Sequence, residues 1–159
     1  MVGNQTGTAQ GATLTLSPGD LAPDFELKDQ HGTPTRLSHH RGTRVVLVFF
    51  PLAFSGICFS ELSTLASTAF PDDVRILGVS VDSMFTLRAW SDQEDFAFPL
   101  LSDFWPHGQV AQAYGVFDEE RGVARRGTFI IDGGGAIVWS IDNPVSTPRD
   151  VADYLKALS

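Results

Sequence analysis

Two apolar runs separated by one helical segment constrain the fold of this chain more than any other feature. Residues 44–50, RVVLVFF, are apolar after the first position, and residues 74–81, VRILGVSV, form a second such run. Runs of this kind are typical of central strands in a sheet that is covered on both faces. Between them, apolar residues recur mostly at steps of three and four from Cys58 to Phe70, which predicts a helix. The three segments together predict a β-α-β unit.

Further elements extend this unit on both sides. Turn residues within 16–42 flank two short alternating stretches, which predicts an N-terminal β-hairpin. Residues 127–141, GTFIIDGGGAIVWSI, predict a second hairpin, and residues 148–159 predict a closing helix. We therefore expect an α/β protein with a thioredoxin-like fold and a mixed central β-sheet flanked by helices, although periodicity alone does not separate it from other small α/β folds. Residues 1–16 are expected to be a disordered tail, and residues 17–159 a single domain.

Charge and hydropathy argue against several classes of function. The chain has 11 basic and 19 acidic residues and a net charge of -8. Nucleic acids and anionic membrane surfaces require a basic footprint, so neither is expected as the main partner. The longest apolar run, residues 45–54, is about half as long as a membrane-spanning helix and contains a proline. With a single cysteine and no recognisable signal peptide, the expected location is the reducing cytoplasm.

Cys58 is the only cysteine, and it lies where the loop of residues 51–57 enters the predicted helix. A lone cysteine is more often a small buried apolar residue than a nucleophile. In the first turn of a helix, however, free backbone N–H groups and the helix dipole stabilise a thiolate. Ser55 stands where a C-x-x-C pair has its first cysteine; its hydroxyl can cap the helix or donate a hydrogen bond to a thiolate or substrate. Pro51 ends the strand and can also shield the thiolate from water.

The spacing P-x-x-x-S-x-x-C, over Pro51, Ser55 and Cys58, resembles the active-site motif of the peroxiredoxins, which are thiol peroxidases. The segment RRGTFIIDGGGAIVWS, residues 125–140, resembles the part of that family that carries the active-site arginine. FFPLAFSGIC and LLSDFWPHG resemble most the one-cysteine alkyl hydroperoxide reductase E group. The resemblance extends over residues 17–158 and implies a peroxiredoxin with a thioredoxin-like fold.

The same resemblance assigns further site residues. The family pattern R-x-T-F places the active-site arginine at Arg126, and alternation along an extended segment turns its neighbour Arg125 away. A glutamate that orients the arginines corresponds to Glu61, although the helix dipole alone also favours a carboxylate there. Trp105 is a candidate for lining a substrate pocket or a subunit contact, with simple packing as the commoner explanation. His31, His39 and His40 are too few to predict a metal site.

The resemblance implies an oxidoreductase that needs no cofactor. Cys58 would be oxidised to a sulfenic acid by hydrogen peroxide, an organic hydroperoxide or peroxynitrite. One related group has a second cysteine five residues after the first, but this chain has Ser63 there, so an external thiol must reduce the sulfenic acid. Candidates are a low-molecular-weight thiol such as mycothiol, or a mycoredoxin-, glutaredoxin- or thioredoxin-like protein. A homodimer is also expected.

Two other functions remain open on the sequence alone. The first is a thiol-based redox sensor or binding module, in which Cys58 is oxidised slowly and a partner recognises the result. The second is a dithiol-disulfide oxidoreductase, which the serine at position 55 makes a poor fit.

Overall fold

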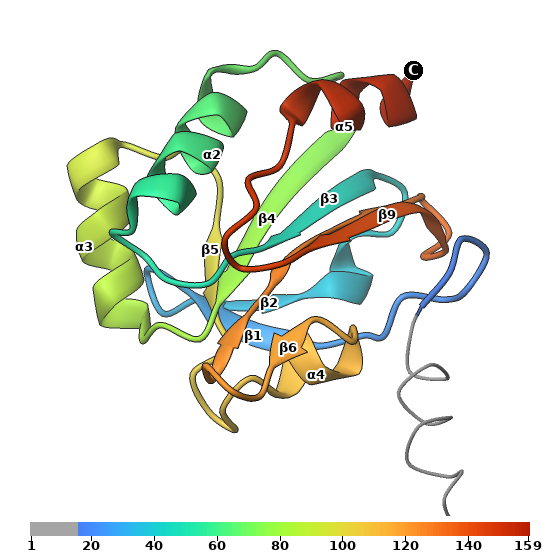
Figure 1. Ribbon diagram of the computed structural model, residues 1–159. Helices are drawn as coiled ribbons and strands as arrows, with labels where there is room; N and C mark the ends of the chain where they lie inside the picture. The colour runs from blue at the N-terminus through green and yellow to red at the C-terminus, as the bar shows by residue number, and fades with distance from the viewer. Residues whose placement is uncertain (1–15) are drawn as a thin grey trace, which may run out of the picture.

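The computed structural model describes residues 16–159, so nearly all of the predicted tail, residues 1–16, lies outside the described part (Figure 1). A seven-stranded mixed sheet runs in the order β2-β1-β5-β4-β3-β8-β9. Its strands are β1 (Glu26–Asp29), β2 (Pro34–Arg36), β3 (Arg44–Phe49), β4 (Val74–Ser80), β5 (Leu100–Ser102), β8 (Arg126–Ile131) and β9 (Ile137–Asn143). The helices are η1 (Leu37–His40), α2 (Gly56–Ser67), α3 (Met84–Glu94), α4 (Gln109–Ala113) and α5 (Val151–Leu158).

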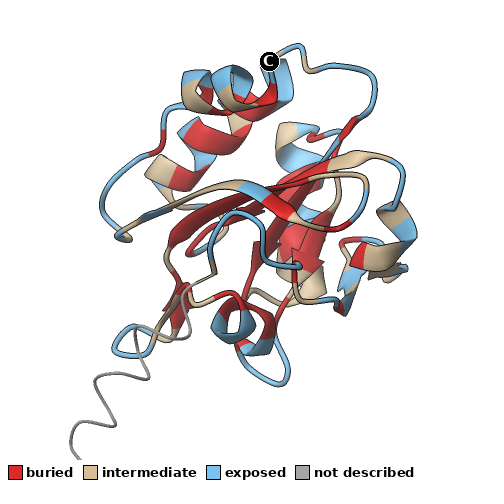
Figure 2. Cartoon of the chain, turned by 90° about the vertical axis from the view of Figure 1, so that its right-hand side faces the viewer, coloured by how far each residue is buried: buried red, intermediate tan, exposed pale blue. Residues whose placement is uncertain are grey.

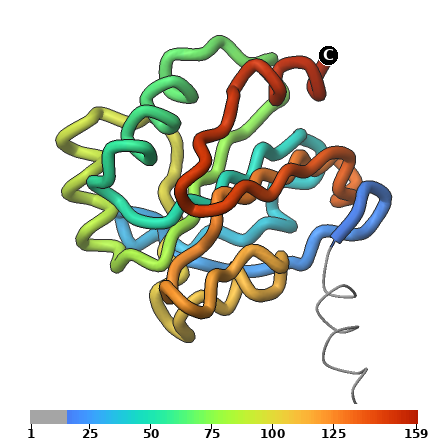
Figure 3. The backbone as a smooth tube through the Cα atoms, viewed as in Figure 1, coloured from blue at the N-terminus to red at the C-terminus, as the bar shows by residue number. Residues whose placement is uncertain are grey.

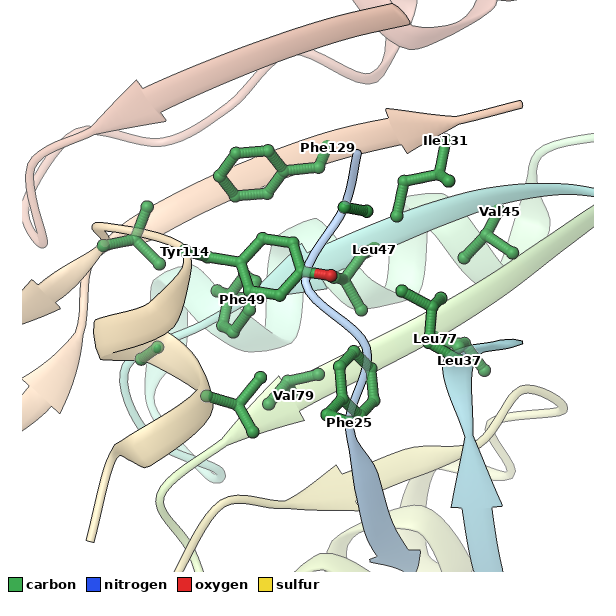
Figure 4. Close-up of a cluster of buried hydrophobic side chains, with 14 of the residues drawn as sticks. Phe25, Leu37, Val45, Leu47, Phe49, Leu77, Val79, Tyr114, Phe129 and Ile131 are labelled. Atoms are coloured by element: carbon green, nitrogen blue, oxygen red, sulfur yellow. The ribbon is translucent and has the colours of Figure 1, made fainter. Parts of the chain in front are cut away.

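The central strand β3 is buried on both faces, as its apolar run predicts. Val45, Leu47 and Phe49 point to one face and join a cluster that also contains Tyr114 and Phe129 (Figure 4). The alternate side chains join a second cluster on the opposite face, which includes residues of α2, α3 and α5. Buried residues therefore follow the strands through the middle of the molecule (Figure 2). The strand owes its position to two apolar layers rather than one.

Strand directions bring three chain segments to one edge of the sheet. β3 is parallel to β4 and antiparallel to β8, with Phe49 opposite Val79 and Val48 opposite Thr128. The carboxyl ends of β3 and β4 therefore lie beside the first residues of β8. From the end of β3 the chain passes through residues 50–55 into α2, and α5 later returns to lie beside that helix (Figure 3). Any site at this edge is assembled from residues that are far apart in sequence.

The predicted thioredoxin-like fold is confirmed, with local differences. The mixed sheet, both hairpins and the helix that connects β3 to β4 are all present. Helix α2 ends at Ser67, so Phe70 lies beyond the helix although it fits the helical spacing. The two-residue strands β6 (Phe117–Asp118) and β7 (Val123–Ala124), and the helix η1, are additional elements too short for periodicity to reveal. Within residues 16–159, no helix is both long and apolar enough to cross a bilayer.

Candidate active site

The first turn of α2 carries backbone N–H groups that no helical carbonyl can satisfy. Ser55 is the N-cap residue, with extended backbone angles, and its carbonyl accepts the first helical hydrogen bond from Phe59 N at 2.9 Å. Its side chain caps no N–H group. Gly56, Ile57 and Cys58 begin the helix, where backbone N–H groups have no intrahelical partner. Cys58 therefore lies at the positive end of the helix dipole.

The Ser55 hydroxyl is free to interact with a bound molecule. Its Oγ is buried and forms no hydrogen bond with any residue in the range 16–159. Buried hydroxyl groups are normally satisfied, and those that are not need an explanation. A small polar ligand beside Cys58 would supply the partner. Of the two roles expected for Ser55, the structure shows the N-cap position but not the capping hydrogen bond.

Cys58 is completely buried and has one charged neighbour. Its side chain belongs to the apolar cluster on the helical face of the sheet, and its exposed fraction is 0%. Arg126 Nη1 lies 3.3 Å from Cys58 Sγ. A thiolate in apolar surroundings is unfavourable unless a cation or hydrogen-bond donor compensates it, and the guanidinium group provides both.

Alternation along the start of β8 separates the two neighbouring arginines, as the sequence predicts. Arg126 points to the helical face and is 2% exposed. Arg125 points the other way, where its Nη2 forms an ion pair with Asp142 Oδ2 at 2.8 Å. Only Arg126 is thus brought to Cys58. Its Nε also donates to Val145 O at 2.6 Å, which fixes the guanidinium plane.

Glu61 holds the guanidinium of Arg126 in place. One turn after Cys58 on α2, its Oε1 accepts a hydrogen bond from Arg126 Nη1 at 2.6 Å and another from Arg149 Nη2 at 2.8 Å. Its Oε2 accepts from the backbone N–H of Arg149 at 2.6 Å. The carboxylate therefore links two arginines that come from different elements, which is the arrangement that the resemblance implied.

Arg149 belongs to this group of charges, although the sequence alone did not single it out. It precedes the N-cap residue of α5, and its Nη1 donates to Phe49 O at 2.6 Å, Gly127 O at 3.0 Å and Thr128 Oγ1 at 3.1 Å. A signal for it existed, because a basic residue at a helix N-terminus is unfavourable with the dipole unless another group compensates it. The expected glutamate that orients arginines also called for a second arginine.

A buried group of three charges lies beside Cys58. Glu61, Arg126 and Arg149 are each at least nine-tenths buried, and together they carry one net positive charge. Burial raises the pKa of Glu61, but the hydrogen bonds and charge of Arg149, with the charge of Arg126, outweigh burial and hold this pKa below its usual value. Glu61 therefore stays ionised between the two arginines.

The two remaining residues expected in the site, Pro51 and Trp105, have different surroundings. Pro51 is buried and lies two residues after Phe49, the last residue of β3, where a bend leads into the loop. Trp105 is 79% exposed and lines a cavity of about 630 Å³ with Lys28, Phe85 and Phe104, among other residues. None of Pro51, Ser55, Cys58 and Arg126 lines that cavity, so the structure does not bring Trp105 together with the thiol. Simple packing does not account for so exposed a side chain either.

No candidate metal site accompanies this arrangement in the part of the chain that the structure describes. Residues 16–159 contain no group of three or more histidine, cysteine, aspartate or glutamate side chains that could hold a metal ion. The chemistry that these residues can perform is that of a buried sulfur beside a fixed guanidinium, a hydroxyl without a partner among the described residues, and unpaired N–H groups at a helix start.

Comparisons with known sequences and with solved structures point to the same kind of protein. The sequence profile of the AhpC/TSA family matches residues 18–140. The chain is 52% identical to alkyl hydroperoxide reductase E of Mycobacterium tuberculosis over 148 residues, which cover 91% of this chain and 97% of that protein. The crystal structure of peroxidoxin BcpB from Mycobacterium tuberculosis superposes with a TM-score of 0.80 at 33% identity, covering 90% of this chain and 96% of the other. Mycobacterium tuberculosis AhpC gives a TM-score of 0.77 at 30% identity, with 91% and 92% covered.

Replacing Glu61 by glutamine tests the buried charge group. Glu61→Gln leaves two buried guanidinium groups without a counter-ion, so we expect unfolding to require about 3–5 kcal/mol less at neutral pH. Because the folded-state pKa of Glu61 is lowered, its contribution is present above the ordinary value of 4.5 and is lost as the pH falls through the folded value. Urea unfolding of both proteins, at neutral pH and in acid, measures the difference.

A matched control is Glu119→Gln, which removes a carboxylate from an exposed loop. It should change the unfolding free energy little at either pH. Equal stability of Glu61→Gln and the wild type at neutral pH would contradict the assignment, as would a difference that stays constant in acid.

Proposed function

The chain belongs to the AhpC/TSA family and is a thiol-dependent peroxidase with a single cysteine, and we propose that Cys58 is its peroxide-reducing nucleophile. The observation that carries this proposal is the 3.3 Å contact between Arg126 Nη1 and Cys58 Sγ, with the arginine itself fixed by Glu61. A buried sulfur held against a buried cation is arranged for reaction as a thiolate.

The proposed reaction transfers one peroxide oxygen to sulfur. The thiolate attacks that oxygen in line with the O–O bond; the S–O bond forms as the O–O bond breaks. The sulfur is oxidised by two electrons to the sulfenic acid, and the peroxide is reduced. Hydrogen peroxide loses hydroxide and an organic hydroperoxide loses alkoxide, and each takes up a proton to give water or an alcohol; peroxynitrite loses nitrite. We propose organic hydroperoxides, hydrogen peroxide and peroxynitrite as substrates; the similarity to an alkyl hydroperoxide reductase favours the first.

Ser55, Arg126 and the first N–H groups of α2 are the proposed binding groups for the peroxide. The unsatisfied Ser55 hydroxyl and the guanidinium group can donate to the two oxygens as charge moves from one to the other. Fixed donors of this kind stabilise the transition state without reorganising during the reaction. Pro51 is proposed to exclude water from the thiolate, as its burial at the start of the loop supports.

Completion of the cycle requires a reductant from outside the chain. There is no second cysteine to form an intramolecular disulfide with the oxidised Cys58. We propose that one external thiol attacks the sulfenic acid with loss of water, and that a second releases Cys58 as the thiolate. A low-molecular-weight thiol such as mycothiol, acting with a mycoredoxin-, glutaredoxin- or thioredoxin-like protein, has the required chemistry. Such thiols are maintained in a reducing compartment, so we propose the cytoplasm as the location.

An exposed apolar patch supports a homodimer. Phe85, Phe104 and Trp105 are 74%, 54% and 79% exposed, and all three line the same cavity. Contiguous exposed apolar surfaces of this kind mark interaction sites. A second copy of the chain is the proposed occupant, because the resemblance implies subunit pairing.

The test of catalysis is the intact mass of the protein after one equivalent of peroxide. Cys58 should gain one oxygen, or form an adduct with a sulfenic-acid trap, and an external thiol should restore the starting mass. The reaction should be orders of magnitude faster than that of free cysteine. A Cys58→Ser control should show neither change. Absence of both products in the wild type would exclude the peroxidase proposal, whereas slow oxidation without turnover would indicate a redox sensor.

The dimer is tested by sedimentation. Trp105→Glu places a charge in the centre of the apolar patch and should convert a dimeric wild type to a monomer. Val138→Glu is the control, since Val138 is also exposed, at 45%, but lies on β9 outside the patch. A monomeric wild type, or a dimer that survives Trp105→Glu, would contradict the proposal.

A further inference from the structure

The loop that delivers Ser55 and Cys58 is held to the sheet by a side chain. This Cys58 loop, residues 50–55, connects β3 to α2. At its start, Phe50 N still donates to Val79 O at 3.0 Å, as a strand residue would. At Ala53, the N–H group donates instead to Asp82 Oδ2, at 2.8 Å. This carboxylate thus takes the place of a strand carbonyl, two residues before Ser55.

Asp82 is itself fixed by the two strands beside it. Its Oδ2 also accepts a hydrogen bond from Ser80 Oγ at 2.7 Å, and Ser80, the last residue of β4, is 1% exposed. Its backbone carbonyl accepts from Ser102 Oγ, in β5, at 2.7 Å. One oxygen of Asp82 therefore joins the Cys58 loop to the rigid end of β4, while β5 holds the main chain of the same residue.

The conformation that Asp82 holds is strained. Phe54 follows Ala53 and has φ of 67°, in the left-handed region that residues with a Cβ rarely adopt. Its ring is half exposed and packs against Trp90 of α3, with ring centroids 6.0 Å apart. A strained residue persists only where its surroundings hold it. The Asp82 hydrogen bond on one side and the Trp90 contact on the other supply that restraint.

We propose that Asp82 is a positioning residue, which holds the Cys58 loop so that the Ser55 hydroxyl stays aligned with Cys58. Without its carboxylate, Ala53 loses its hydrogen-bond acceptor and Phe54 can relax to negative φ. Ser55 is the next residue, so the relaxation moves its hydroxyl away from Cys58 and Arg126. The inference rests on the proposed catalytic role of Cys58 and adds a residue that contacts neither Cys58 nor Arg126.

The chain offers a control for Asp82 with nearly the same bonding. Asp24 accepts hydrogen bonds from the backbone N–H and the hydroxyl of Ser38, both at 2.9 Å. It thus connects one N–H group and one serine hydroxyl, as Asp82 does, but it holds η1 rather than the Cys58 loop. Asp24→Ala should therefore remove similar interactions without affecting the alignment at Cys58.

The experiment compares Asp82→Ala, Asp82→Asn and Asp24→Ala with the wild type by stopped-flow oxidation with hydrogen peroxide. We expect Asp82→Ala to lower the second-order rate constant about tenfold to a hundredfold, the usual consequence of small misalignment. Asp82→Asn should restore most of the rate, because its amide oxygen can accept the same two donors. Asp24→Ala should react like the wild type.

A second readout separates positioning from loss of fold. Alkylation of Cys58 by iodoacetamide does not need the peroxide-binding donors, so in Asp82→Ala it should stay equal or become faster while peroxide oxidation slows. An Asp82→Ala protein that is oxidised as fast as a reactive wild type overturns the inference alone. So does an equal loss of rate in Asp24→Ala. A wild-type Cys58 that forms no sulfenic acid overturns the proposed function itself.

Discussion

The Glu61 carboxylate, buried between two arginines, is the interaction on which the site depends. Two guanidinium groups could not stay buried side by side without it. Arg149 is the third member of this group of charges. It also donates hydrogen bonds to the carbonyls of Phe49 in β3 and Gly127 in β8, and so connects these two strands. The remaining positive charge is directed at Cys58 through Arg126.

The sheet supplies the geometry that this charge group needs. Strand β3 is buried on both faces and ends beside β4 and the first residues of β8. The Cys58 loop, Asp82 and Arg126 therefore meet at one edge of the sheet. Helix α2 then points its unpaired N–H groups at the same place. Ser55 adds a hydroxyl with no partner among residues 16–159. Rigid elements therefore present Arg126 and the N–H groups, while the strained Cys58 loop presents the Ser55 hydroxyl.

Much of this arrangement could be predicted from the sequence because its signals are local. The apolar runs give the central strands, and the spacing of Ser55 and Cys58 at a helix start gives the proposed nucleophile. Alternation distinguishes Arg126 from Arg125. The roles of Arg149 and Asp82 could not be predicted, because they arise from contacts across the fold. Arg149 forms a hydrogen bond with Glu61, which is 88 positions away in the sequence, and Asp82 forms one with Ala53, which is 29 positions away. Neither periodicity nor a motif predicts contacts between residues so far apart, because the order of the strands in the sheet brings them together.

The account is tested most directly by the rate at which hydrogen peroxide oxidises Cys58 in the wild type, Arg126→Gln and Arg125→Gln. Arg125 is the matched control, because it is adjacent but pairs with Asp142 on the other face. If Arg126 prepares Cys58 for reaction, Arg126→Gln should be oxidised about a hundredfold more slowly than the wild type, whereas Arg125→Gln should react like the wild type. Equal rates for Arg126→Gln and the wild type would contradict the account.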